Sequence, residues 1–95
     1  MKGYIVCVYK GISSEEKLKE YAEKAGAAVE KYKGKFLLKG GKSTTNEGYK
    51  SPRTVVIEFP SYDEANSFYN SKEYQEAHDL LKGHAERHHQ TIEGV

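Results

Sequence analysis

Residues 4–9 read YIVCVY, an unbroken apolar run, and this stretch decides the fold. β-branched and aromatic residues favour strands, and successive side chains of a strand point to opposite faces. Because the run is apolar at odd and even positions alike, it predicts a strand in a sheet that is covered on both faces.

A helix is expected directly after this strand. Ser13 stands three residues before Glu16, the spacing of a capping box, in which each side chain bonds the free backbone N–H of the other residue. Apolar residues then recur at helical spacing, namely Leu18, Tyr21, Ala22, Ala25, Val29 and Tyr32. We expect the helix to end at Gly34, because glycine readily adopts the left-handed conformation that closes many helices.

Two more strands are predicted in the middle of the chain. Residues 35–39 read KFLLK and precede Gly40 and Gly41, a pair that suits a bulge or bend. After a polar turn at residues 46–48, residues 54–59 read TVVIEF and give the clearest strand pattern in the sequence.

The second helical region is predicted in two pieces. Ser61 with Glu64 repeats the capping-box spacing, and Ser71 can cap a second piece that ends near Gly83. The chain after Glu86 is mostly polar. Residues 90–93 are assigned to a fourth strand mainly because the sheet needs another member.

The predicted order of elements is βαββαβ, over a single domain of residues 1–95. This order predicts an α+β, ferredoxin-like fold, a four-stranded antiparallel sheet with two helices on one face. The other face would then leave the apolar residues of the first strand exposed. We therefore expect a homodimer through the sheet face, which gives a dimeric α/β barrel.

Composition disfavours several kinds of partner and compartment. The 15 basic and 14 acidic residues are mixed along the chain, which argues against a nucleic-acid partner. Cys7 is the only cysteine and stands in an apolar run, so we expect a buried thiol in a reducing compartment. The apolar run near Met1 is too short for a signal peptide or a membrane span, and we expect a cytoplasmic protein without membrane binding.

Four stretches carry a resemblance to a known family: residues 33–41 (KGKFLLKGG), residues 52–61 (PRTVVIEFPS), residues 69–75 (YNSKEYQ) and the closing Glu93-Gly94. Together they resemble a family of bacterial proteins of about the same length as this chain. That family is catalogued as a domain of unknown function in the dimeric α/β barrel superfamily. The superfamily includes cofactor-free monooxygenases, polyketide cyclases, lactone isomerases, haem enzymes and stress-related proteins.

The resemblance implies a pocket between the helices and the concave side of the sheet. The polar residues expected in it are Tyr69, Tyr74, His78, Arg53 and Lys39. Related cyclases are similar in placing a tyrosine and a histidine from the second helical region in this pocket. Relatives usually carry Arg-Gly-Gly where this chain has a lysine before the two glycines, so the charge is kept and the planar fork is lost.

Tyr74 and His78 are the predicted catalytic pair. Four residues apart on a helix, they share one face, where a tyrosine hydroxyl can donate to a developing oxyanion and a histidine can move a proton. Tyr69, Arg53 and Lys39 are predicted to bind substrate, the two cations by clamping a carboxylate or enolate. The alternatives are tyrosines and a histidine that only fill the core, and cations that are solvated or paired with Glu58.

Four histidines, namely His78, His84, His88 and His89, raise the question of a metal site. Neighbouring His88 and His89 would project to opposite faces of a strand. Only His84 and His88 would share a face, and only if the helix continued past Gly83. We therefore expect no metal site. No nucleotide, redox-thiol or haem motif is present either, and no bound cofactor is expected.

Two functions remain open from the sequence. The first is a cofactor-independent small-molecule enzyme that acts on a carbonyl or phenolic metabolite by proton transfer or oxyanion stabilisation. The second is a ligand-binding or stress-related dimer without chemistry. Whether the chain is an enzyme stays undecided at this stage.

Overall fold

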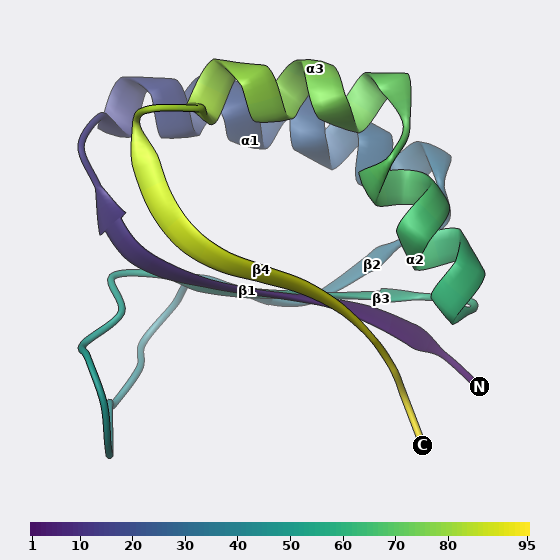
Figure 1. The fold of residues 1–95 in the computed structure, drawn as a ribbon, viewed down its shortest axis with the longest axis horizontal. Helices are drawn as coiled ribbons and strands as arrows, with labels where there is room; N and C mark the ends of the chain where they lie inside the picture. Colours follow the sequence, from purple (N-terminus) through teal and green to yellow (C-terminus); the bar gives the residue numbers. More distant parts are fainter.

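The computed structural model describes residues 1–95 and has the predicted ferredoxin-like order of elements. The elements are β1 (Gly3–Ile12), α1 (Glu15–Lys31), β2 (Lys35–Lys39), β3 (Thr54–Phe59), α2 (Tyr62–Tyr69), α3 (Lys72–Leu81) and β4 (Ala85–Glu93). Figure 1 shows α1 and α3 side by side in one layer above the sheet, while α2 descends toward one end of it. The fold class predicted from the sequence is confirmed.

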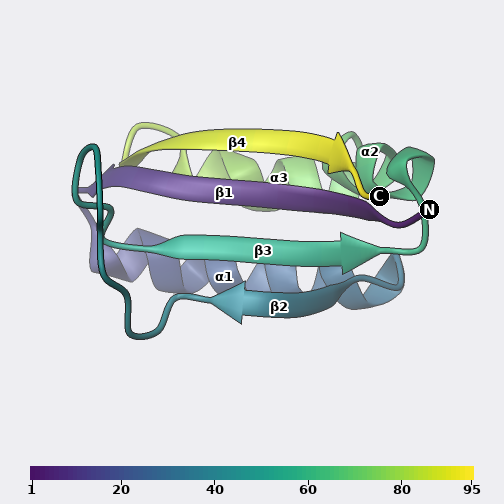
Figure 2. The same cartoon turned by 90° about the horizontal axis from the view of Figure 1, so that it is seen from below.

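The sheet has four antiparallel strands in the order β2-β3-β1-β4. At its centre, Val6 of β1 pairs with Val56 of β3 on one side and with Gln90 of β4 on the other. Figure 2 shows the four strands from below, with all the helices behind them. One face of the sheet is thus covered by helices and the other is open in a single chain.

The core lies between the sheet and the helices. Ile5, Cys7 and Tyr9 on β1 are buried on the helix side, and the alternate residues of that strand are only partly covered. The strand is therefore apolar on both faces as predicted, but one chain alone covers only one of them. The open face and its surroundings still present exposed Leu37, Leu38 and Ile92.

The start and end of α1 differ from the prediction by one residue each. Ser14, not Ser13, caps the helix, and its hydroxyl accepts from the backbone N–H of Lys17 at 3.1 Å. Ser13 is instead held by the sheet, because its backbone N–H and hydroxyl both donate to the carbonyl of His84. At the other end Lys33, not Gly34, has the positive φ of 63°.

Gly34 is required for a different reason. A Cβ on Gly34 would lie 2.7 Å from the ring of Phe59 and 2.8 Å from a methyl group of Val29. Its lack of a side chain therefore allows close packing of the chain after α1 against the core.

The two caps predicted for the second helical region are confirmed. Ser61 accepts from the backbone N–H of Glu64, and Ser71 accepts from that of Tyr74, both at 3.1 Å. The fourth strand is much longer than residues 90–93, because the polar segment from Ala85 pairs with the whole length of β1. Backbone pairing places its side chains alternately toward the helices and toward the open face.

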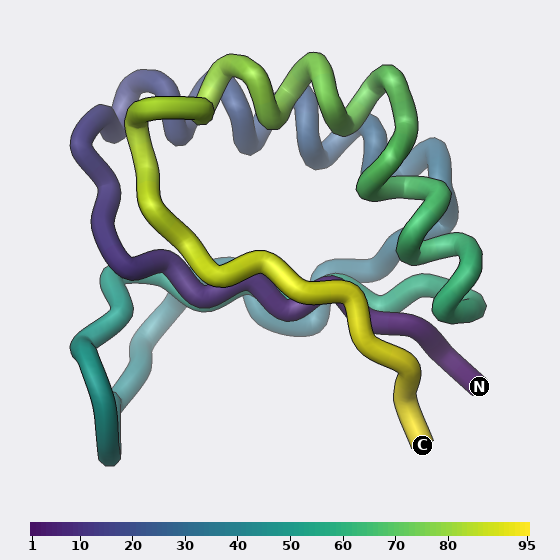
Figure 3. Tube along the Cα trace, in the orientation of Figure 1, coloured from purple at the N-terminus to yellow at the C-terminus, as the bar shows by residue number.

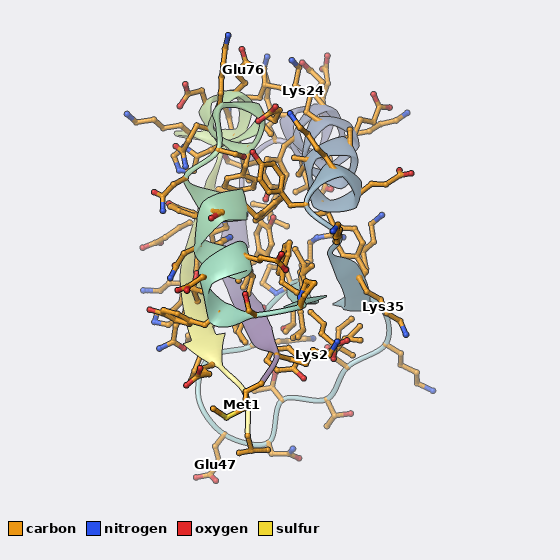
Figure 4. All side chains as sticks on the ribbon, turned by 90° about the vertical axis from the view of Figure 1, so that its right-hand side faces the viewer. Met1, Lys2, Lys24, Lys35, Glu47 and Glu76 are labelled. Atoms are coloured by element: carbon orange, nitrogen blue, oxygen red, sulfur yellow. The ribbon has the colours of Figure 1, made fainter.

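Residues 40–53 form a long polar connection between β2 and β3. Figures 1 and 3 show this segment dropping away from the sheet on the side opposite the helices, and Figure 4 places Glu47 at its far end. At the other extreme of the molecule, Lys24 and Glu76 project outward from α1 and α3 (Figure 4). No helix is long and apolar enough to cross a membrane.

Candidate functional site

A small cavity lies between the helix layer and the concave face of the sheet. Its volume is about 30 Å³, and most of its wall is apolar side chains from α1, α2 and the strands. The polar residues in its wall are Tyr9, Tyr21, Tyr74, Lys39, Arg53, Arg87 and His89. No carboxylate lines it, although three cations do.

Arg87, on β4, is the centre of a hydrogen-bond network at one end of this cavity. Its Nη1 atom donates to the hydroxyl of Tyr21 at 2.9 Å and to that of Tyr9 at 3.3 Å, and its Nη2 atom donates to Tyr74 at 3.0 Å. The hydroxyls of Tyr21 and Tyr74 lie 2.9 Å apart. The partly buried guanidinium therefore faces neutral oxygen atoms and has no carboxylate partner.

Burial keeps two tyrosines of this network, Tyr9 and Tyr74, in their protonated form. It raises the pKa of Tyr9 to about 12, and burial together with Tyr21 raises the pKa of Tyr74 well above its usual value. Burial also raises the pKa of the Cys7 thiol, whose sulfur lies 3.6 Å from Nη1 of Arg87. These groups are hydrogen-bond donors at neutral pH and not anions.

His89 lies beside Tyr74, with Nε2 at 3.4 Å from the tyrosine hydroxyl. Burial first, and then the charge of Arg87, lowers the pKa of His89 to about 3. The ring is therefore neutral at physiological pH and is a weak base. Its ring also packs on that of Tyr69, with the two centroids 5.0 Å apart.

The other two cations line the same cavity from the part of the sheet formed by β2 and β3, across β1 from Arg87. Arg53 precedes β3, and its guanidinium carbon lies 5.9 Å from the centre of the Tyr9 ring. Its Nε atom is buried and has no hydrogen-bond partner. Lys39, at the end of β2, is exposed and holds its amine 4.5 Å from the centre of the Phe36 ring.

A second, shallower hollow lies outside the cavity between α3 and β4. Tyr69 and His78 line this hollow and do not line the cavity, whereas Arg87 and His89 line both. These two residues of β4 therefore form the wall between the interior and the hollow. Nδ1 of His78 makes no hydrogen bond and lies 3.5 Å from the carboxylate of Asp79.

The structure thus divides the five predicted site residues into two groups. Tyr74, Arg53 and Lys39 line the cavity, and Tyr69 and His78 line the hollow. Tyr74 and His78 share a helix face, with ring centroids 6.4 Å apart, but the hydroxyl of Tyr74 bonds within the Arg87 network, and Tyr74 does not line the hollow that His78 lines. Glu58 pairs with neither cation and instead accepts from the Tyr4 hydroxyl at 3.1 Å.

Sequence reasoning missed Arg87, Tyr21 and His89 as site residues. The signal that could have found Arg87 and His89 is that side chains of a strand point alternately to its two faces. Had that strand been extended back to Ala85, the side chains of Arg87 and His89 would have been placed opposite Tyr9 and Cys7, on the helix side.

The size of the cavity limits what it can hold without rearrangement. A volume of about 30 Å³ accommodates about two water molecules. Most ligand pockets are larger, roughly 300–1,000 Å³. An organic ligand must therefore displace side chains at the rim, and the exposed Lys39 is the least constrained of them.

Comparison with protein families agrees with this fold and extends over almost the whole chain. A family described as a domain of unknown function, DUF1330, matches residues 2–95. The chain belongs to the DUF1330 family. This confirms the resemblance to a family of unknown function inferred from the sequence. No curated protein matches the chain significantly.

Solved structures share the fold of this DUF1330 domain at low sequence identity. A protein of unknown function from Rhodopseudomonas palustris aligns with a TM-score of 0.78 at 13% identity, over 99% of this chain and 82% of its own. A dimeric protein of unknown function and ferredoxin-like fold from Bacteroides fragilis aligns with a TM-score of 0.63 at 18% identity, covering 98% and 96%.

A putative antibiotic biosynthesis monooxygenase from Caulobacter crescentus aligns with a TM-score of 0.58 at 12% identity, over 99% of this chain and 89% of its own. At these identities the comparisons establish the fold. The structural neighbours thus include one protein described as dimeric and one described as a putative monooxygenase, on one common architecture.

Proposed function

We propose that the protein is a small-molecule enzyme that stabilises an oxyanion of a carbonyl or phenolic compound with its own side chains. One observation carries this proposal. Arg87 directs its donors at the hydroxyls of Tyr9, Tyr21 and Tyr74, and no carboxylate neutralises its charge. Fixed donors and an unpaired cation in a largely apolar space are the elements of an oxyanion site.

Each residue of the network has a defined role in this proposal. Tyr74 stays protonated, and the hydroxyl of the Tyr21–Tyr74 pair that is not donating to the other donates to the oxyanion, while Arg87 supplies positive charge. The neutral ring of His89 holds the hydroxyl of Tyr74 in place. His78, in the outer hollow, is proposed to exchange a proton with the ligand or with water as the ligand passes Arg87.

Entry from the hollow is the second part of the proposal. Arg87 and His89 separate the hollow from the cavity, and Tyr69 stacks on His89 at the outer side. An outward movement of the His89 side chain, with Arg87 still held by its tyrosine partners, would join the two spaces and supply the volume that the cavity lacks. Tyr69 then contacts the ligand at the entrance, which is the binding role expected for it.

The proposal is tested with 4-nitrophenol, whose phenolate absorbs visible light. A site that stabilises an oxyanion lowers the pKa of the bound phenol, so binding just below that pKa in solution increases phenolate absorbance. We expect this signal to be lost in Arg87→Met and reduced several-fold in Tyr74→Phe. Tyr49→Phe, in the exposed connection before β3, is the matched control and keeps the signal.

Absence of the phenolate signal in the wild-type protein would contradict the oxyanion site. The second candidate, a ligand-binding or stress-related dimer without chemistry, is favoured by the small cavity and by the low basicity of His89. Mass spectrometry of compounds that co-purify with the chain separates the two functions. An intact hydrophobic metabolite unchanged after incubation supports the second, and conversion to a product supports the first.

The proposal also includes a homodimer formed through the open face of the sheet. That face carries the partly covered Val6 and Val56 at its centre and the exposed Leu38 beside them. A monomeric protein rarely leaves such a patch in water. The description of the Bacteroides fragilis neighbour as dimeric supports the assignment.

A further inference from the structure

The three cations of the cavity form a row across one end of the sheet. Tyr9 of β1 pairs with Arg87 of β4, and its backbone N–H donates to the carbonyl of Arg53 at 2.9 Å. Lys39 of β2 pairs with Val55, two residues beyond Arg53. The row therefore runs from edge strand to edge strand on the concave face, with Tyr9 between the two arginines.

The Lys39 and Arg53 end of this row carries two cations without a carboxylate beside them. The buried Nε atom of Arg53 has no hydrogen-bond partner, and no carboxylate lines the cavity. Buried polar atoms without a partner are uncommon, since each loses its bonds to water. The missing partner is best supplied by an acceptor that enters the cavity.

Gly40 leaves room for the Arg53 guanidinium. A Cβ at Gly40 would lie 3.1 Å from Nη1 of Arg53, and Gly40 has a φ of 73°, which other residues rarely adopt. The lysine and glycine of the KGG stretch thus act together on this end of the cavity. Lys39 brings a charge to its rim, and Gly40 keeps space for the guanidinium.

We propose that the natural ligand is an organic acid whose carboxylate binds between Arg53 and Lys39 while its carbonyl or phenolic oxygen meets Arg87 and Tyr74. This assignment of substrate class rests on the proposed oxyanion site and adds a second contact to it. The wall between the two polar ends is formed by apolar side chains such as Phe36, Val55 and Ile57. The middle of the ligand is therefore apolar or aromatic.

Two probes that differ only in a carboxylate test this assignment, namely phenol and 4-hydroxybenzoate. Their affinities are measured by isothermal titration calorimetry at one fixed, low salt concentration. We expect the wild-type protein to bind 4-hydroxybenzoate at least about tenfold more tightly than phenol, as for a charge-assisted pair worth about 1.4 kcal/mol. Arg53→Met is expected to remove this preference and to leave the affinity for phenol unchanged.

Two further variants separate a specific contact from a general effect of charge. Arg53→Lys keeps the charge and is expected to retain part of the preference, because a lysine lacks the bidentate fork. Lys24→Met removes a cation from the outer face of α1 and is expected to keep the full preference for 4-hydroxybenzoate over phenol. Thermal unfolding of each variant is measured as a control, to check that the fold is intact.

The possible results distinguish this inference from the proposed function. Equal affinity of the wild-type protein for both probes, with Arg87-dependent binding of phenol, overturns the carboxylate contact and keeps the oxyanion site. A tenfold preference that persists in Arg53→Met also overturns it. Failure of phenol and 4-hydroxybenzoate alike to bind, together with no phenolate signal from 4-nitrophenol, overturns both.

Discussion

The hydroxyls of Tyr21 on α1 and Tyr74 on α3 lie 2.9 Å apart, and each accepts a hydrogen bond from Arg87 on β4. An edge strand is thereby joined to both long helices through one guanidinium. Because the Arg87 guanidinium has no carboxylate partner in this network, we expect Arg87 to contribute more to function than to stability.

Replacement of Arg87 by methionine is expected to change stability little or to raise it. A partly buried charge without a counter-ion is unfavourable, and an apolar side chain of similar length removes that penalty while Tyr21 and Tyr74 still bond each other. We expect the free energy of unfolding from urea denaturation to stay within about 1 kcal/mol of the wild-type value or to exceed it. A loss of several kcal/mol would instead make Arg87 a structural residue.

His89 is expected to make stability depend on pH. The folded protein lowers the pKa of His89 to about 3, whereas the unfolded chain takes up this proton at about pH 6.5. The contribution of neutral His89 to the free energy of unfolding is complete above about pH 6.5. As the pH decreases from there to about 3, this contribution falls by about 1.4 kcal/mol per pH unit.

Urea denaturation at several pH values between about 4 and 7.5 measures this contribution. His89→Gln is expected to flatten the pH dependence in this range. His88→Gln, one residue earlier and exposed, is the control and should keep the wild-type slope. Identical slopes in the wild-type protein and His89→Gln would contradict the prediction.

The cap at Ser71 is expected to stabilise the fold more than the cap at Ser61. Ser71 is only 7% exposed, and its hydroxyl accepts from the backbone N–H of Tyr74 and donates to the carbonyl of Phe68 at 2.7 Å. Ser71→Ala should cost about 1–2 kcal/mol and Ser61→Ala about 1 kcal/mol or less. Equal losses in chemical denaturation would show that the second hydrogen bond adds nothing.

Two glycines are expected to respond to alanine in opposite directions. Gly26 lies within α1, and a Cβ there meets no atom within 4 Å, so Gly26→Ala should raise stability by about 0.5–1 kcal/mol. Gly34→Ala should lower it by about 1–3 kcal/mol, since the added Cβ collides with Phe59. Melting temperatures of the two variants test the pair, and a gain in both would contradict the tight packing of Gly34.

A charge at the centre of the open sheet face is expected to prevent dimerisation. Val6 lies on that face beside Val56, so Val6→Glu would bury a carboxylate at the apolar centre of the proposed interface, where its desolvation is unfavourable. Static light scattering at micromolar concentration should then report a monomer. Ala27→Glu adds the same charge to the exposed side of α1 and should remain dimeric. A dimeric Val6→Glu would place the interface elsewhere.

The sequence by itself determined the elements whose signal is local. Runs of β-branched and aromatic residues define β1 and β3, and the serines at 61 and 71 are placed where the free N–H groups of a helix start require an acceptor. The same local rules do not distinguish Ser13 from Ser14. Which of the two serines caps α1 depends on how far β1 pairs with β4. Ser13 donates to the carbonyl of His84 at the end of this pairing, so Ser14 is the residue left to cap the helix.

Tertiary structure alone decided the site. The last strand is polar, so its length followed from backbone pairing with β1 and not from its side chains. Only that pairing places Arg87 beneath Tyr21 and Tyr74, which are distant in sequence, and separates Tyr74 from His78 although both share a helix face. Local patterns determine which residues form a strand or helix, whereas contacts between elements determine which side chains meet.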